Sequence, residues 1–276
     1  VPDEWHLPVI KKLLEDKATK ILVEKPICVP SQIKAMEDLL NRFSKIQICV
    51  NETYASSEVV KIVKEKSKEY SIVQPAILIE RSKNRMEDIV RGRFIDKELG
   101  VFALEVPHSL TAVAATGDKR LPFKIQEVSL EDMKLPSGKI LPRQGKGKIS
   151  YLTEDGCQVK ILTAMNGEVL HPLSEINAPS SIPFGDKTRY RILVLEEGEY
   201  KIIGQFEPIP NWPRFLGRVL VYRRGALLEA IKTEDKPMNR QLERAVQYFK
   251  GKEVNPGSPK EALSLVKFLG KVIERL

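Results

Sequence analysis

The chain has 276 residues, of which 42% are hydrophobic and 30% are charged, with 45 Lys and Arg against 37 Asp and Glu. This length allows about two domains with cores of their own, and the blend of both charges with aliphatic residues excludes wholesale disorder. Three cysteines without a CxxC pair exclude a disulfide scaffold and a cysteine-rich zinc site. We expect no signal peptide, and no apolar run reaches the ~18 residues that a membrane span needs. We therefore expect a cytoplasmic protein without a membrane partner or a metal.

The net charge of +8 comes from basic residues that are spread along the chain, mostly beside Glu and Asp. The densest cluster contains Arg81, Lys83, Asn84, Arg85, Arg91 and Arg93, together with Glu87 and Asp88. Nucleic-acid binding favours basic blocks interleaved with aromatic residues, and this chain has none. We interpret the charge as solvated surface charge and expect no nucleic-acid partner. Attraction of an anionic substrate or of a dinucleotide phosphate stays open.

Helical and strand patterns alternate over the first 56 residues. Apolar spacing predicts a helix over 7–16, and the aliphatic run 21–23 predicts a strand buried on both faces of a parallel sheet. Ser31 is a candidate N-cap for a helix over 32–43, and 46–50 is a second aliphatic run. Strand, helix and strand with short links are typical of a βαβ unit. A complete doubly wound domain needs about six strands, so we expect residues 1–56 to be only part of one.

After a helical pattern over 58–70, the chain changes from Ile72 to alternating strands, several of which are separated by turn signals. An amphipathic helix is predicted over 58–70, a second over 101–115, and two more over 239–249 and 259–276. Strands are predicted at 76–80, 125–130, 148–153, 158–164, 189–195, 200–206 and 218–222. Residues 57–276 are therefore expected to form an α+β domain with a mostly antiparallel open sheet.

The strongest local signal is Glu24-Lys25-Pro26, which follows the first aliphatic strand directly. Ligands of open α/β sheets bind beyond the carboxyl ends of the strands. Pro26 biases Lys25 toward an extended conformation, so the ammonium group is expected to project into that crevice. From the residues alone, an ordinary strand end with two solvated charges is an equal alternative.

This ordered set of motifs resembles the Gfo/Idh/MocA oxidoreductases, relatives of glucose–fructose oxidoreductase and inositol dehydrogenase. The resemblance covers essentially the whole chain. The matching segments are Val1-Pro2 with His6, Glu24-Lys25-Pro26, Asn51-Glu52-Thr53-Tyr54, Gly100-Val101-Phe102 through Pro107-His108, Met238 to Leu242, and Ala262-Leu263.

The resemblance implies hydride transfer between NAD or NADP and a carbinol or carbonyl carbon, often of a sugar or cyclitol. It implies that 1–56 is the C-terminal part of a dinucleotide-binding Rossmann domain and that 57–276 binds substrate. Lys25 and His108 would be catalytic, since a cation stabilises an alkoxide and imidazole exchanges protons near neutrality. Cofactor contacts would come from Pro2, His6, Glu24, Lys25 and Pro26, and substrate contacts from Asn51, Glu52 and Tyr54. In relatives the outer face of the sheet commonly pairs with another subunit, so we expect a homodimer or homotetramer.

Two departures from the family pattern stand out. Leu104 and Thr111 occupy positions near His108 where the family often has Asp, so the acid/base relay is expected to use Glu105, three residues before His108. No G-x-G-x-x-G occurs anywhere in the chain. For dinucleotide binding we expect about 70–100 further residues upstream, on the size of the missing half-domain. The alternative is a non-catalytic relative that acts as a ligand- or partner-binding module, and a basic nucleic-acid binder is a weaker one.

Overall fold

A computed structural model describes residues 2–93, 96–117, 120–186, 188–209 and 212–276. The chain divides into two units, and each is described by itself. The first holds the residues up to Ser56 together with Pro237–Arg275, and the second holds Ser57–Lys236. We expected a boundary after residue 56 but assigned 237–276 to the second domain. The last two helices instead pack with the first unit, which makes it discontinuous in sequence.

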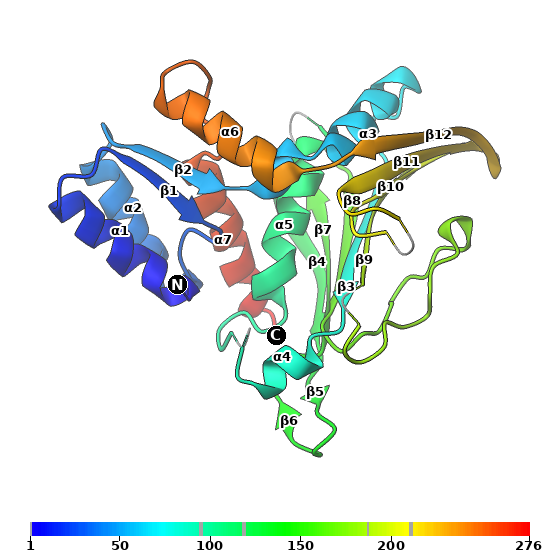
Figure 1. Ribbon diagram of the computed structural model, residues 1–276, viewed down its shortest axis with the longest axis horizontal. Helices are drawn as coiled ribbons and strands as arrows, with labels where there is room; N and C mark the ends of the chain where they lie inside the picture. Colours follow the sequence, from blue (N-terminus) through cyan, green and yellow to red (C-terminus); the bar gives the residue numbers. More distant parts are fainter. Residues whose placement is uncertain (1, 94–95, 118–119, 187, 210–211) are drawn as a thin grey trace. The chain divides into compact units, whose positions relative to one another are not determined.

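The first unit is built on two parallel strands, β1 (Lys20–Glu24) and β2 (Gln47–Asn51). Helices α1 (His6–Glu15), α2 (Ile33–Arg42) and α7 (Pro259–Ile273) lie on one face of this pair, and α6 (Pro237–Phe249) lies over β2 on the other (Figure 1). Short 3-10 turns complete the unit at Asp3–Trp5 (η1), Pro30–Gln32 (η2) and Thr53–Ser56 (η3). Ser31 lies within η2 and does not cap α2, whose N-cap position is Gln32.

β1 is buried on one face only, which corrects the expectation of a strand buried on both. Ile21 and Val23 point into a core shared with Ile10 of α1, Met36 of α2 and Val266 of α7. Leu22 points to the opposite face and stays 40% exposed, because α6 contacts β2 there. The run of three aliphatic residues concealed this alternation.

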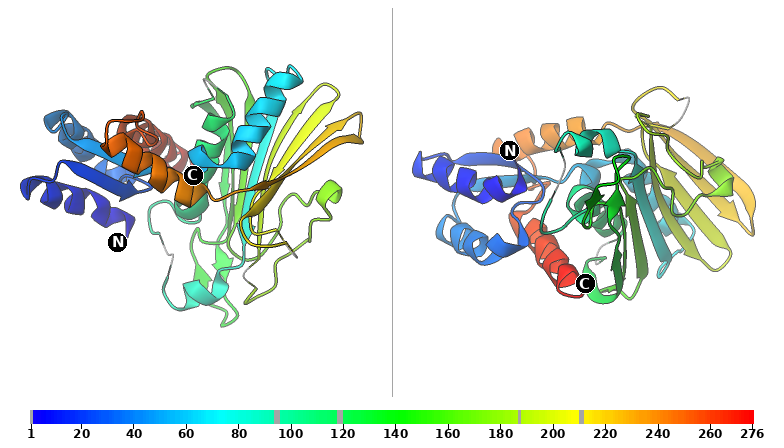
Figure 2. Two further views of the ribbon diagram at one scale, coloured as in Figure 1. Left: turned by 45° about the horizontal axis from the view of Figure 1, so that its top comes forward. Right: turned by 90° about the horizontal axis from the view of Figure 1, so that it is seen from below.

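The second unit is built on an eight-stranded sheet with the order β12-β11-β10-β9-β3-β8-β7-β4. Its strands are β3 (Ala76–Lys83), β4 (Pro122–Leu130), β7 (Lys146–Thr153), β8 (Gln158–Ala164), β9 (Arg189–Glu197), β10 (Tyr200–Gln205), β11 (Leu216–Arg223) and β12 (Ala226–Glu234). Only β3 and β8 run parallel to each other, and the other pairs are antiparallel. The sheet twists so that its strands fan out from β4 to β12 (Figure 2). The predicted fold class, a small parallel sheet followed by a mostly antiparallel one, is confirmed.

Helices α3 (Glu58–Glu69) and α5 (Phe102–Ala115) cover one face of this sheet, which we call the inner face (Figure 1). On the other, outer face, the segment between β8 and β9 packs Val169, Leu173 and Ile182 onto β9, β10 and β11. The carboxylate of Glu80 fixes this segment, since it accepts hydrogen bonds from the backbone N–H groups of Leu170 and His171, both at 2.7 Å. Part of the outer face is therefore covered by the chain itself.

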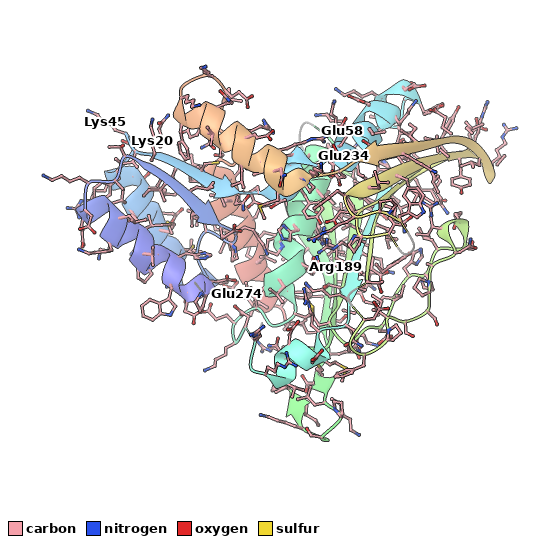
Figure 3. All side chains as sticks on the ribbon, in the orientation of Figure 1. Lys20, Lys45, Glu58, Arg189, Glu234 and Glu274 are labelled. Atoms are coloured by element: carbon pink, nitrogen blue, oxygen red, sulfur yellow. The ribbon has the colours of Figure 1, made fainter. Side chains whose placement is uncertain are left out.

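The remaining elements of the second unit are short. They are α4 (Met86–Val90), η4 (Ser174–Ile176) and the two-stranded β5 (Met133–Lys134) and β6 (Ile140–Leu141). The edge strand β12 was not expected from the sequence. It forms a hairpin with β11 through Arg224 and Gly225, both at positive φ. Glu58 at the start of α3 and Glu234 at the end of β12 lie close together (Figure 3), since the neighbouring Asp235 accepts a hydrogen bond from the Glu58 backbone at 2.8 Å.

Candidate functional site

The turn at Lys25-Pro26 lies where β1 ends, at the carboxyl edge of the two parallel strands. Pro26, Ile27 and Cys28 are buried directly after it, whereas Lys25 is half-buried. Because residues 26–28 are packed in the core, they restrict the position of the Lys25 backbone. The lysine thus occupies the edge of the sheet at which ligands of α/β folds bind.

His6, at the start of α1, fixes this turn. Its ring is 4% exposed, and Nδ1 lies 2.7 Å from the carbonyl oxygen of Pro26. A carbonyl only accepts, so Nδ1 carries the proton and donates it. The Gln32 side-chain amide also donates to the Glu4 backbone, at 2.8 Å, and joins η1 to η2. The motifs around residues 6 and 26, which the sequence suggested belong together, are in direct contact.

Glu24 and Asn51 face each other as the last paired residues of β1 and β2. The Asn51 amide donates to the Glu24 carboxylate at 2.6 Å and to the Met238 sulfur of α6 at 3.2 Å. The flipped amide would place Asn51 Oδ1 next to the Glu24 carboxylate, where two oxygens would repel each other, so the orientation with Nδ2 toward Glu24 is favoured. The Asn51 Oδ1 is buried and accepts no hydrogen bond from the described residues. An enclosed acceptor at this edge fits a ligand that brings a donor.

The other residues assigned to the first unit differ in accessibility. Glu52 and Tyr54 follow β2 and are only 7% and 5% exposed. Pro2 is exposed at the start of η1, where its carbonyl accepts from the Trp5 backbone at 2.9 Å. Val1 lies outside the described residues.

In the second unit, Gly100 sets the start of α5. Its φ is +58°, and a Cβ atom there would lie 2.4 Å from the carbonyl oxygen of Arg143. That same carbonyl accepts from the Val101 backbone at 2.8 Å. Only glycine fits this left-handed position and close approach, so the beginning of the helix that carries Glu105 and His108 is fixed.

Glu105 lies in the first turn of α5, 3% exposed, and faces three cationic side chains of the sheet. Arg81 donates through Nε at 2.5 Å, Lys83 donates to the other carboxylate oxygen, and Arg191 lies 3.9 Å away. Arg81 and Lys83 alternate along β3 and therefore share the inner face, and Arg191 pairs with Arg81 from β9. We call Arg81, Lys83, Arg191 and Glu105 the inner-face cluster.

The charges of this cluster shift its pKa values in a consistent way. Burial by itself would raise the pKa of the Glu105 carboxyl, but Lys83, Arg81 and Arg191 together hold it well below its usual value of 4.5. Burial lowers the pKa of Lys83 to about 8, against the attraction of Glu105, and Arg191 adds to the lowering. Glu105 therefore remains ionised at neutral pH, and Lys83 titrates near pH 8.

These observations revise two interpretations made from the sequence. Arg81 and Lys83 belong to the basic cluster that we expected to be solvated, yet they are 1% and 7% exposed. Burial of these two side chains could have been predicted, because Arg81 and Lys83 continue the alternation of Ile77 and Ile79 on one face of the strand. Glu105 was expected to relay protons, and its low pKa favours a fixed negative charge instead. Within the described residues, no group of His, Cys, Asp and Glu could hold a metal ion.

His108 lies one turn beyond Glu105 on α5 and is half-buried. Its charge lowers the pKa of Glu105, so the two side chains are within electrostatic reach. Lys25 belongs to the first unit and His108 to the second. Their expected meeting at one reaction centre remains a prediction.

The fold is similar to those of several solved structures that are named as oxidoreductases. The chain superposes on an oxidoreductase from Thermotoga maritima with a TM-score of 0.64 and 14% identity, covering 99% of this chain and 74% of that one. It superposes on a protein from Desulfitobacterium hafniense, provisionally named an NADPH-dependent oxidoreductase, with a TM-score of 0.69 and 12% identity, covering 100% and 76%. A UDP-N-acetylglucosamine 3-dehydrogenase from Acidithiobacillus ferrooxidans matches with a TM-score of 0.62 and 10% identity, covering 98% and 74%.

No protein-family model matches the sequence, and neither does any curated protein. At these low identities the structural likeness establishes the fold alone. No helix among the described residues is long and apolar enough to cross a membrane.

Proposed function

We propose that this protein is an NAD(P)-dependent oxidoreductase of the Gfo/Idh/MocA type. It transfers a hydride between NAD or NADP and a carbinol or carbonyl carbon of a sugar, cyclitol or related small molecule. The observation that carries this proposal is the position of Lys25, at the carboxyl edge of a parallel strand pair in a turn held by His6. The names of the structural neighbours, which include a sugar-nucleotide dehydrogenase, support it.

The residues at this edge fit the nicotinamide end of a dinucleotide. The buried, unpartnered Asn51 Oδ1 and the Glu24 carboxylate beside it are acceptors for amide and hydroxyl donors. His6 and Pro26 fix the turn that carries Lys25, and Pro2, which precedes η1, is assigned to the same cofactor contact. The sequence supplies no Gly-rich turn for the pyrophosphate, so these residues account for one end of the cofactor only.

The chemistry assigned to the chain is electrostatic and acid/base in kind. When bound, the nicotinamide accepts or donates the hydride. The Lys25 ammonium group stabilises negative charge that develops on the reacting oxygen, and His108 exchanges the proton. Glu105 acts on His108 as a fixed negative charge that stabilises the imidazolium form. Asn51, Glu52 and Tyr54 are assigned to the substrate side.

The test is hydride transfer by the protein expressed from its whole reading frame, with NADH and NADPH deuterated at C4 and a panel of keto-sugars and keto-cyclitols. Mass spectrometry of the products detects the transferred deuterium. Lys25→Met is expected to reduce kcat by at least 100-fold, the contribution of one oxyanion-stabilising donor. Lys20→Met is the matched control, since Lys20 lies exposed at the opposite end of the same strand (Figure 3).

An unchanged kcat for Lys25→Met would refute the assigned role of Lys25. Absence of deuterium in every product, with ligand binding retained, would favour the alternative of a non-catalytic binding module. The missing G-x-G-x-x-G is the observation that keeps this alternative in view.

A further inference from the structure

The inner-face cluster brings more positive than negative charge into a buried site. Arg81, Lys83 and Arg191 are 1%, 7% and 7% exposed. All three lie within ion-pair distance of Glu105, and Arg191 also lies 4.0 Å from Glu207. Three cations therefore surround the Glu105 carboxylate. Buried charge is costly unless it is compensated, and a further anion would compensate it.

The cations are not equivalent in position. The Arg81 side chain is 1% exposed, whereas the side chains of Lys83 and Arg191 are 9% and 8% exposed. Lys83 and Arg191 therefore form the accessible side of the cluster. They come from β3 and β9, neighbouring strands of the sheet, so their spacing is rigid.

We propose that Lys83 and Arg191, backed by Arg81, bind an oxyanion of the substrate, so that the substrate class is an acidic sugar derivative bearing a carboxylate or a phosphate. This inference rests on the proposed oxidoreductase function and narrows its substrate. Arg191 offers a planar fork of donors that matches either oxyanion, and Lys83 adds a point charge. His108, one turn along α5 from Glu105, then lies beside the anchored end of the substrate.

The first experiment measures anion binding without any turnover. Calorimetry and thermal unfolding are followed with inorganic phosphate and with D-gluconate, against sodium chloride at equal ionic strength and against neutral glucose. We expect phosphate or gluconate to bind and to raise the unfolding midpoint above that in chloride or glucose. The two anions separate a phosphate-bearing from a carboxylate-bearing substrate. Equal midpoints in all four solutions would overturn the inference.

Substitutions then locate the binding. Lys83→Met and Arg191→Met each remove one charge-assisted hydrogen bond and are expected to weaken anion binding about 10- to 100-fold. Lys160→Met is the matched control, because Lys160 pairs in register with Leu78 of β3, which packs on the outer face. Lys83→Arg and Arg191→Lys keep the charge and serve if the Met variants fail to fold. If the Met variants fold and bind the anion with unchanged affinity, the cluster has a structural role alone. The same conclusion follows if both conservative variants bind with unchanged affinity and Lys83→Arg keeps the pH dependence.

The pH dependence gives a second readout. Lys83 faces Glu105 from α5, Arg191 from β9 and Arg85 from the chain after β3, and its pKa is lowered to about 8. Anion affinity is therefore expected to fall as the pH rises through 8, and this step should disappear in Lys83→Arg, which stays charged. Lys20→Met, at the exposed start of β1, is expected to bind the anion normally. A protein that reduces neutral sugars but binds neither anion would refute this inference and leave the proposed function intact.

Discussion

Glu105 shows most clearly how one residue organises the second unit. A single buried carboxylate neutralises part of the charge of three cations that otherwise repel one another. Breaking a buried pair by removing one partner is strongly destabilising, because the remaining charges stay buried without compensation.

Glu105→Gln is expected to lower the free energy of unfolding by about 3–5 kcal/mol at pH 7, measured by urea denaturation. Its folded-state pKa lies well below 4.5, so the stabilisation by the carboxylate is complete above pH 4.5 and is lost as the pH falls through the folded-state value. The difference in the free energy of unfolding between the wild type and Glu105→Gln should therefore become smaller at acidic pH. Glu127→Gln is the control, since Glu127 is 55% exposed in its pair with Lys148 and such pairs contribute about 0–1 kcal/mol. A loss equal to that of the control would contradict the role given to Glu105.

His6 gives a second prediction at the scale of a residue. Loss of its buried hydrogen bond to Pro26 in His6→Ala is expected to cost about 1–3 kcal/mol of stability and to reduce hydride transfer, because the turn that carries Lys25 loosens. His6→Asn places an amide donor near the Nδ1 position and should recover part of both. Urea denaturation and the deuterium assay measure the two effects. Full activity in His6→Ala would separate His6 from the positioning of Lys25.

How far the sequence predicted these residues depends on how local their contacts are. Glu24, Lys25 and Pro26 could be grouped with His6, because they follow β1 directly and His6 begins α1, the helix just before that strand. The inner-face cluster could not, since Arg191 reaches it from a strand about a hundred residues beyond β3. That encounter depends on sheet order and register, neither of which shows in a local pattern.

At the scale of the elements, helix and strand types were predicted well wherever the pattern was long. The α5 helix, the α3 helix and most strands of the large sheet lie where their periodicity places them. β12 was missed because it is an edge strand, exposed along most of its length, so its sequence shows no clear alternation of apolar and polar residues. β1 was misread because its aliphatic run hides a one-sided burial.

The start of α5 carries the prediction at this scale. Gly100→Ala would force a side chain into a left-handed conformation and against the Arg143 carbonyl, so we expect a loss of more than ~2 kcal/mol in stability. Gly138→Ala is the control, because Gly138 also has positive φ, +84°, but no atom within 4 Å of its added Cβ. It should lose only the conformational part, about 1–2 kcal/mol. Equal losses, measured by thermal unfolding, would show that the close approach to Arg143 does not matter.

At the scale of the whole molecule, the outer face of the sheet bears on assembly. We expected a homodimer or homotetramer through this sheet, and that expectation remains a proposal. Val169, Leu173 and Ile182 already cover part of the outer face. Leu227 and Leu228 are 53% and 48% exposed on the edge strand β12, which has unpaired backbone groups on one side. We therefore place the expected contact at this edge of the sheet.

Light scattering on the wild type is expected to show a dimer or a larger assembly, and Leu227→Asp with Leu228→Asp should shift it toward monomer, since two charges would be buried on association. Val254→Asp is the control, because Val254 is 79% exposed and belongs to the first unit. A monomeric wild type at working concentration would refute the proposal. If the assembly of the double variant has the same mass as that of the wild type, the subunit contact does not involve Leu227 and Leu228.

The discontinuous first unit has a consequence for how the protein is made. Strands β1 and β2 with helices α1 and α2 leave the ribosome before residues 57–236, whereas α6 and α7 are synthesised after them. Helix α7 contributes to the core of the first unit. At usual elongation rates the interval is roughly ten to forty seconds. During that time Ile10, Met36 and Val50 lack the aliphatic cover that α7 later supplies. We therefore expect the nascent chain to bind chaperones and residues 57–236 to fold first.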